Sequence, residues 1–199
     1  MKLIVGLGNP GSEYYLTRHN AGFLAIQYFC EYLGVSLKPG RGDWYGIELK
    51  HKGEKFYIMK PTTFMNASGN AVLDFVNKKK INLSDILIVY DDFQLPLGTI
   101  RIRAKGSDGG HKGLASVIYS LNSLEFPRMR IGIGTGECVS MDNYTDFVLS
   151  KFSEDELEKM KSLMPYIKDA ILCFIDEGIY SAMNKFNKNF FEPEENKSL

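Results

Sequence analysis

Two short apolar runs constrain the fold of this chain more than any other feature of its sequence. Residues 85–90 read DILIVY, and residues 2–7 read KLIVGL and lead into a glycine-containing turn. Uninterrupted apolar runs of this length are typical of strands that are buried on both faces, as in sheets covered by helices. We therefore expect two buried strands, with residues 85–90 at the centre of the sheet.

The remaining periodicity adds further strands and several helices. WYGIELK and KFYIMK, joined by HKGE, predict a hairpin, and GTIRIRAK and MRIGIG predict two more strands, the first with Ile inward and Arg outward. Helices are expected from near Asn20 to Gly34, from Ala67 to Lys80, up to about Leu124, and from a Ser153–Glu156 capping box to Gly178, followed by a short basic helix. The pattern predicts a single-domain three-layer α/β sandwich, with a twisted mixed β-sheet flanked by helices.

Composition excludes several classes of protein. The 199 residues fit one domain, and 24 basic against 24 acidic residues give no net charge that would name a partner. The three cysteines are widely spaced without a C-x-x-C, so they predict reduced thiols in a cytoplasmic protein and no zinc site. No run approaches the ~20 apolar residues of a membrane span, and no signal peptide is evident.

Charge is nevertheless unevenly distributed along the chain. Between Gly98 and Arg130 six basic residues stand against Asp108 and Glu125: Arg101, Arg103, Lys105, Lys112, Arg128 and Arg130. This segment forms either a local anion-binding face or an ordinary solvated surface. Residues 191–199 form an acidic tail, which we expect to be disordered.

The first loop reads literally as G-x-G-x-x-G, with Gly6, Gly8 and Gly11. A dinucleotide-binding fingerprint needs a helix that starts inside the glycine turn and an acidic residue ~20 positions further on at a strand end. Here the polar and aromatic segment SEYYLTRHN follows Gly11, and Glu31 falls within a helical pattern. A nicotinamide-dependent enzyme is therefore disfavoured.

Polar side chains gather instead at the ends of predicted elements. Asn9, Tyr14 and His19 follow the first strand, Asn66 precedes a helix, and Asp91 ends the run 85–90. Each has a structural alternative: a turn for Asn9, a helix cap for His19 or Asn66, and a strand end for Asp91. Loops at strand ends are where α/β sites form, so the residues alone indicate a His–Asp hydrolytic site without naming a substrate.

Six motifs in register give a more specific indication. They are VGLGNPG (5–11), TRHNAGF (17–23), KPTTFMNASG (60–69), VYDDFQLPLG (89–98), GSDGGHKGL (106–114) and RMRIGIG (128–134). In order and spacing the chain resembles the bacterial peptidyl-tRNA hydrolase family, and the resemblance covers residues 1–190. It implies one catalytic domain over 1–190, with the acidic tail outside it.

The resemblance implies hydrolysis of the ester that joins a peptide to the terminal ribose of tRNA, which recycles tRNA during translation and ribosome rescue. His19 would be the catalytic base and Asp91 its orienting partner. An imidazole held by a carboxylate can activate water against an ester without a metal, a cofactor or a covalent nucleophile. The enzyme would act as a cytoplasmic monomer without an obligate protein partner or a membrane.

The remaining site residues follow from the same motifs. Substrate would be bound by Asn9, Tyr14, Met65, Asn66 and Lys112. The phosphates of elongator tRNAs would be met by Arg103 and Arg130, with Lys105 and Arg128 close enough to help. Phosphate contacts of this kind position a nucleic acid without reading its sequence.

Two positions depart from the family pattern. Lys112 stands where the family commonly has Asn, and an ammonium can only donate hydrogen bonds, so we expect its role to shift from positioning water or peptide toward phosphate contact. Gln94 stands where an acidic residue is frequent. The alternative function is a non-catalytic RNA-binding relative on the same fold, against which His19 and Asp91 argue.

Overall fold

The two apolar runs form neighbouring parallel strands at the centre of one sheet. The computed structural model describes residues 1–135 and 144–192. Strand β1 (Lys2–Gly6) pairs with β5 (Ile86–Pro96), and the register sets Leu3 opposite Ile86. Their side chains are buried on both faces of the sheet, as continuous apolar runs predict.

Eight strands complete this sheet in the order β2-β3-β4-β1-β5-β7-β6-β8. The other six are β2 (Lys38–Pro39), β3 (Trp44–His51), β4 (Glu54–Pro61), β6 (Thr99–Arg103), β7 (Arg128–Gly134) and β8 (Lys188–Asn189). The central pairs β4–β1, β1–β5 and β5–β7 are parallel, whereas the outer pairs are antiparallel. The predicted mixed sheet and the predicted hairpin are confirmed.

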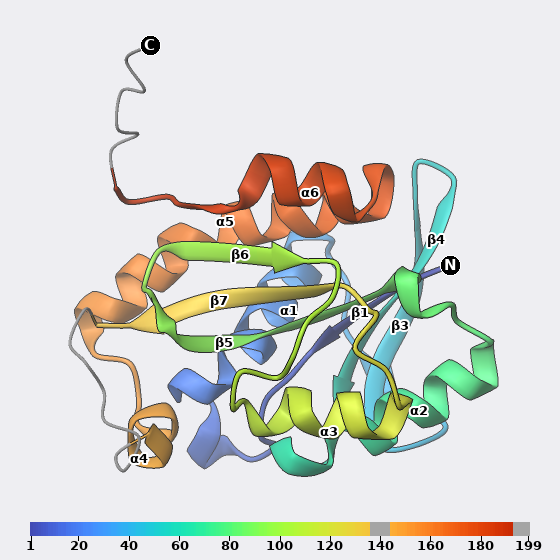
Figure 1. Cartoon of the computed structure of the whole chain (residues 1–199), viewed down its shortest axis with the longest axis horizontal. Coiled ribbons are helices and arrows are strands. Elements are labelled where there is room, and N and C mark those ends of the chain that lie inside the picture. The colour runs from blue at the N-terminus through green and yellow to red at the C-terminus, as the bar shows by residue number, and fades with distance from the viewer. Residues whose placement is uncertain (136–143, 193–199) are drawn as a thin grey trace.

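Helices cover the two faces of the sheet (Figure 1). Their bounds are α1 (Ala21–Tyr32), α2 (Ser68–Lys79), α3 (Lys112–Leu121), α4 (Tyr144–Leu149), α5 (Glu154–Glu177) and α6 (Ile179–Phe186). Alternate residues of β1 divide between two cores: Leu3 and Val5 pack with α2 and α3, and Ile4 packs with α1 and α5. The three-layer sandwich is therefore confirmed.

Three boundaries differ from the sequence-based expectation. Strand β5 continues beyond Tyr90 to Pro96, so Asp91 lies inside a strand, paired with Ile131 of β7, rather than at its end. Helix α3 ends at Leu121 instead of near Leu124, and α4 was not expected. Residues 193–199 lie outside the described residues, so the disordered tail stays a prediction.

The glycines of the first loop serve close packing of α1 on β1. A Cβ atom on Gly6 would lie 2.5 Å from the Gly22 carbonyl oxygen, and one on Gly22 would lie 2.5 Å from the Leu7 carbonyl oxygen. Gly11 has a φ of 112° and leads into a 3₁₀ turn, and α1 begins only at Ala21. The helix start that a dinucleotide fingerprint requires is therefore missing from this turn.

Among residues 1–135 and 144–192, no helix combines the length and the apolar character that crossing a membrane requires.

Candidate active site

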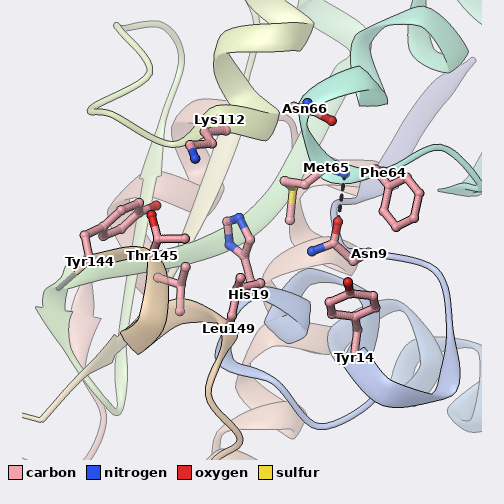
Figure 2. A pocket seen from close by; sticks show the side chains of 11 residues that line it. Asn9, Tyr14, His19, Phe64, Met65, Asn66, Lys112, Tyr144, Thr145 and Leu149 are labelled. Atoms are coloured by element: carbon pink, nitrogen blue, oxygen red, sulfur yellow. Dashed lines mark hydrogen bonds between the residues drawn. The ribbon is translucent and has the colours of Figure 1, made fainter. Parts of the chain in front are cut away.

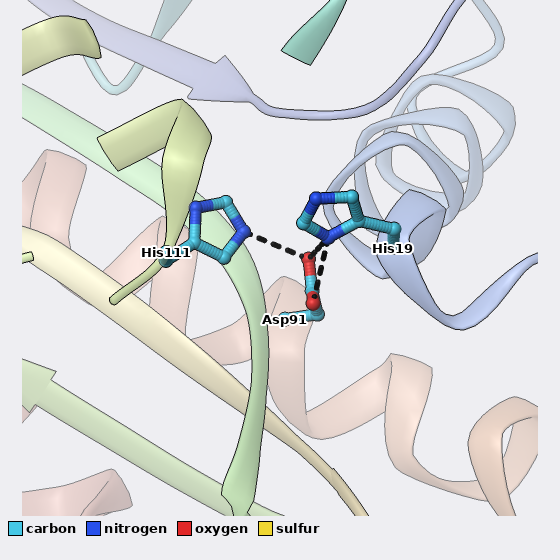
Figure 3. A group of neighbouring side chains, drawn as sticks. All are labelled: His19, Asp91 and His111. Atoms are coloured by element: carbon cyan, nitrogen blue, oxygen red, sulfur yellow. Dashed lines mark hydrogen bonds and ion pairs between the residues drawn. The ribbon is translucent and has the colours of Figure 1, made fainter. Parts of the chain in front are cut away.

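The two predicted catalytic residues, His19 and Asp91, are in direct contact (Figure 3). Asp91 is 1% exposed, and its two oxygens lie 2.9 and 3.0 Å from Nδ1 of His19. His19 lies in the 3₁₀ turn η2 (Arg18–Asn20) just before α1. Packing of α1 against β1 brings this turn beside β5, so residues 72 positions apart meet at hydrogen-bond distance.

A second histidine, which the sequence analysis did not assign to the site, holds the same carboxylate. Nε2 of His111 lies 3.0 Å from Asp91 Oδ1. His111 is the N-cap residue of α3, and its Nδ1 accepts a hydrogen bond from the backbone N–H of Leu114. Because Nδ1 accepts, Nε2 carries the proton and donates to Asp91.

The same logic fixes the tautomer of His19. Its Nδ1 faces only carboxylate oxygens, so it donates to Asp91, and the other nitrogen, Nε2, keeps its lone pair. Within the described chain Nε2 has no hydrogen-bond partner, and the ring borders an open pocket. This is the state in which an imidazole can accept a proton from a bound molecule.

Electrostatics keeps Asp91 ionised. Burial alone would raise the pKa of this carboxyl group, but electrostatic attraction to the two imidazole rings and the hydrogen bonds from His111 and His19 outweigh burial and hold the pKa well below its ordinary value. The buried negative charge in turn favours an imidazolium on His19 when that ring takes up a proton.

His19 lies in the middle of a pocket of about 360 Å³ (Figure 2). The wall combines residues from four parts of the chain: Asn9, Tyr14, Phe64, Met65, Asn66, Lys112, Tyr144, Thr145, Val148 and Leu149. All five predicted substrate-binding residues are among them, and α4 and Phe64 were not foreseen. Helix α4 has only six residues, too few for a helical period to be read from the sequence.

Asn9 presents a free amide N–H₂ to this pocket. Its Oδ1 accepts a hydrogen bond of 2.9 Å from the backbone N–H of Met65, which fixes the orientation of the amide and leaves Nδ2 without a partner among the described residues. Asn20 clamps the backbone of Asn9 by a donated and an accepted hydrogen bond of 3.0 and 2.7 Å. Asn20 therefore positions a donor beside its neighbour His19.

The structural alternatives for two site residues are wrong. Asn66 makes no capping bond: α2 begins after Ala67, whose side chain caps nothing, and the Gly69 N–H is taken by Ser116 of α3. His19 likewise does not cap α1. Both side chains are left to the pocket, where Figure 2 shows Lys112 near His19 as well.

Arg18 ties the turn that carries His19 to the C-terminal part of the chain. Its Nη2 lies 2.6 and 2.9 Å from the two carboxylate oxygens of Glu156, and its Nη1 donates to the Lys151 carbonyl. The side chains of Arg18 and Glu156 are only 11% and 15% exposed. Glu156 also accepts a hydrogen bond from the Ser153 N–H in the capping box of α5. The same carboxylate therefore caps the N-terminus of α5 and binds the turn that carries His19.

The basic residues predicted to contact phosphate are of two kinds: some side chains are accessible to solvent, and one is buried. Arg101 lies opposite Arg130 on β6 and β7, and Arg103 lies opposite Arg128, so the register places the four arginines on one face of the sheet. Arg103 is exposed, and Arg130 is partly exposed and paired with Asp92. Lys105 is exposed, 3.3 Å from Glu125.

Arg128 lies on that face by register, but its side chain is covered by other parts of the chain, so its assignment as a phosphate contact is a correction. The side chain is 2% exposed, and its guanidinium donates to the carbonyl groups of Gly106, Ser107, Leu124 and Phe126. The alternation of side chains along β7 correctly predicts the face of the sheet on which Arg128 lies. However, the glycine-rich loop folds over its guanidinium, and all of the guanidinium N–H groups donate to backbone carbonyls.

One group of described side chains has the composition of a metal site. His19, Asp91 and His111 each offer a ligand atom, within 4.8 Å of one another. The separations of 2.9 and 3.0 Å are those of N–H···O hydrogen bonds, and both nitrogens carry protons that a metal would have to displace. The donor set therefore fits proton transfer better than metal binding.

The fold and this geometry define an α/β protein with a buried, hydrogen-bonded histidine–aspartate pair beside an open pocket. A family model described as peptidyl-tRNA hydrolase matches residues 3–196. A peptidyl-tRNA hydrolase of Pelodictyon phaeoclathratiforme is 50% identical over 188 residues, 94% of this chain and 98% of that protein. One of Clostridium acetobutylicum is 44% identical over the same shares of both chains. The chain belongs to the peptidyl-tRNA hydrolase family.

Solved structures agree with this assignment. The crystal structure of peptidyl-tRNA hydrolase from Acinetobacter baumannii superposes with a TM-score of 0.89 at 32% identity, and covers 96% of both chains.

Proposed function

We propose that this chain hydrolyses the ester bond between the peptide and the tRNA of peptidyl-tRNA, with His19 as the catalytic base. The observation that carries the proposal is the His19–Asp91 pair: Nδ1 is 2.9 Å from the carboxylate, and Nε2 is free in the pocket. Family membership supplies the substrate class.

The chemistry follows from the positions of the donors and acceptors. Nε2 of His19 takes a proton from a water molecule as the oxygen of that water attacks the ester carbonyl carbon. The resulting oxyanion accepts hydrogen bonds from Asn9 Nδ2 and the Asn66 amide. His19 then returns the proton to the ribose oxygen as the C–O bond breaks, which releases the peptide acid and tRNA with a free hydroxyl.

Each group contributes a defined share of the rate. General base catalysis is worth about 10²–10⁴-fold, and one oxyanion donor contributes roughly 2.7–4 kcal/mol. Asp91 keeps His19 in the productive tautomer and stabilises the imidazolium. Burial, followed by the charges of Asp91 and Asp92, raises the pKa of Tyr144, so its hydroxyl group stays a hydrogen-bond donor at the pocket rim.

We place the tRNA acceptor stem on the face formed by β6 and β7. Arg101, Arg103 and Arg130 lie on this one face, so phosphate oxygens that approach it meet several guanidinium groups. Arg103 and Arg130 are the principal contacts, with Lys105 at the edge, and backbone contacts without base readout suit a protein that accepts all elongator tRNAs. Lys112, at the pocket, is left to contact the substrate as a donor only.

We also place the activity in the cytoplasm, as a monomer whose catalytic domain is residues 1–190, without an obligate protein partner. Cys30 and Cys173 are free and buried, which suits a reducing compartment. Burial raises the pKa of the Cys30 thiol to about 11, so it stays protonated and inert.

Release of the blocked amino acid from N-acetyl-aminoacyl-tRNA tests the proposed function. We expect hydrolysis by the wild-type protein and a loss of at least about 10²-fold in kcat for His19→Ala, with the fold retained by circular dichroism. Binding of tRNA without cleavage by the wild-type protein would favour the non-catalytic RNA-binding alternative. A near-wild-type rate for His19→Ala would remove His19 as the base.

A further inference from the structure

A second cavity, of about 190 Å³, lies across the Asn9–Gly11 loop from the active site. Asn9 belongs to the linings of both cavities. The rest of the second cavity is built mainly by α1, by the start of β3 and by the end of β4, and neither His19 nor Asp91 lies in it. The two hollows are therefore neighbours that share one wall.

Lys60 is the charged group of this second cavity. It lies on β4 directly opposite Tyr45 of β3, and its Nζ sits 4.3 Å from the centre of the Phe23 ring. The side chain is half-buried, and in the described part of the chain its ammonium group has no hydrogen bond or ion pair. Burial lowers the pKa of Lys60, which records the cost of keeping this cation away from water.

The surroundings of Lys60 are suited to an anion on an otherwise apolar ligand. Contact with Phe23 offsets only part of the desolvation of an ammonium group. Tyr45 and Tyr15 present half-exposed rings with phenolic hydroxyls, and Thr62 adds another hydroxyl. Hydroxyl and ammonium donors together match carboxylate or carbonyl oxygens.

The order of the strands in the sheet indicates which part of the substrate would lie in the second cavity. Lys60 is on β4, two strands from β5, which carries Asp91, whereas Arg103 and Arg130 are on β6 and β7 on the other side of β5. With the tRNA phosphates on β6 and β7 and the ester at His19, the peptide continues toward β4.

We propose that this second cavity is a peptide subsite in which Lys60 binds an acidic side chain of the nascent peptide. The proposal rests on the proposed function. Asn9 separates the ester from this subsite, so the residues that reach it lie a few positions before the esterified residue. An extended peptide advances about 3.4 Å per residue, so three consecutive acidic residues cover about 10 Å of its path.

The test compares peptides on one tRNA. N-acetyl-Asp-Asp-Asp-Ala and N-acetyl-Ala-Ala-Ala-Ala esters of the same tRNA are hydrolysed by the wild-type protein and by Lys60→Gln. We expect the ratio of kcat/KM between acidic and neutral peptides to fall by about 10-fold or more in Lys60→Gln, the size of one hydrogen bond between charged groups. Lys55→Gln, on the same strand with its side chain 57% exposed, is the matched control and leaves the ratio unchanged.

Two results would overturn the subsite. One is an unchanged ratio in Lys60→Gln with its thermal stability preserved. The other is an equal loss for both peptides together with a smaller salt dependence, since that result assigns Lys60 to a tRNA phosphate.

A binding measurement separates this proposal from the proposed function. The free peptide N-acetyl-Asp-Asp-Asp-amide, titrated into ¹⁵N-labelled protein, should shift the amide signals of Lys60 and Tyr45, and Lys60→Gln should weaken the binding. Failure of the wild-type protein to cleave any ester would refute the hydrolase while leaving this titration to be judged by itself. An absence of shifts would refute the subsite alone.

Discussion

His19 and His111 share one carboxylate but differ in what else they contact. His111 uses both ring nitrogens inside the protein, one toward Asp91 and one toward the Leu114 N–H. His19 uses only Nδ1. For this reason we expect only His19 of the two to exchange a proton with substrate, and we assign His111 a positioning role, in which it holds Asp91 from its second side.

Replacing the carboxylate tests this division of roles. Asp91→Asn keeps the shape but removes the charge that stabilises an imidazolium on His19, so we expect kcat to fall by about 10²–10⁴-fold. Turnover of N-acetyl-aminoacyl-tRNA is the measurement, with Asp108→Asn in the exposed glycine-rich loop as the control. If Asp91→Asn kept more than a third of the wild-type kcat, the charge of Asp91 would have no catalytic part.

Site residues could be predicted from the sequence where a single short motif indicates the function of the residue. His19, Asp91 and Asn9 are close in space, as predicted. His111, Asn20 and Arg18 were not assigned these contacts, because their hydrogen bonds reach residues 20, 11 and 138 positions away. Arg128 was wrong for a related reason: strand alternation gives a face, but not which loop covers it.

The turn η2 is too short to hold its own shape and depends on contacts to α4 and α5. Arg18 supplies them, with its guanidinium near the rings of Phe147 and Phe152 and its ion pair to Glu156. The position of His19 is therefore coupled to the start of a helix more than 130 residues further along the chain.

Glu156→Gln isolates this coupling, since Gln can still serve in a capping box. The substitution leaves the charge of the mostly buried Arg18 without its counter-charge. We therefore expect a loss of about 3 kcal/mol in the free energy of unfolding and a lower kcat. Urea denaturation gives the stability. Glu158→Gln, in an exposed pair with Lys161, should change it by less than about 0.5 kcal/mol.

The same pair predicts a pH dependence. Burial would raise the pKa of Glu156, but the hydrogen bonds from Arg18 and Ser153 and the charge of Arg18 together outweigh burial, and the pKa is lowered in the folded state. A lowered folded-state pKa means that the pair stabilises fully above the unfolded value of about 4.3 and is lost as pH falls below it. The stability difference between wild-type and Glu156→Gln should therefore shrink below about pH 4; a difference constant down to pH 3 would contradict the ion pair.

Elements with a strong period were predicted well, and short ones were not. The hairpin, α1, α2 and the capping box of α5 are confirmed. Strand β5 extends through polar residues because β7 supplies its hydrogen bonds, which no local pattern reports. The two-residue strands β2 and β8 likewise exist only through their neighbours.

The molecule as a whole is neutral, yet its charge is arranged so that one sheet face is rich in arginine. A neutral protein with a local basic face attracts nucleic acid without binding it indiscriminately. The sequence alone did not decide between an anion-binding face and an ordinary solvated surface for these residues.

Salt dependence measures whether this face binds phosphate. Arg103→Ala and Arg130→Ala should each raise KM for peptidyl-tRNA and reduce the slope of log binding constant against log salt by about 1. Lys161→Ala, on α5, is the control of equal charge and should leave the slope unchanged. Slopes unaltered in both arginine variants would mean that the face is only solvated.

The tie between Arg18 and Glu156 also bears on when the protein becomes active. During its own synthesis this chain is itself an ester of tRNA, and the turn that carries His19 emerges from the ribosome early. Its anchor at residue 156 emerges only when most of the polypeptide has been made. We therefore expect a half-made copy, which still lacks residue 156, to hold the turn with His19 less firmly and to hydrolyse esters more slowly than the finished protein.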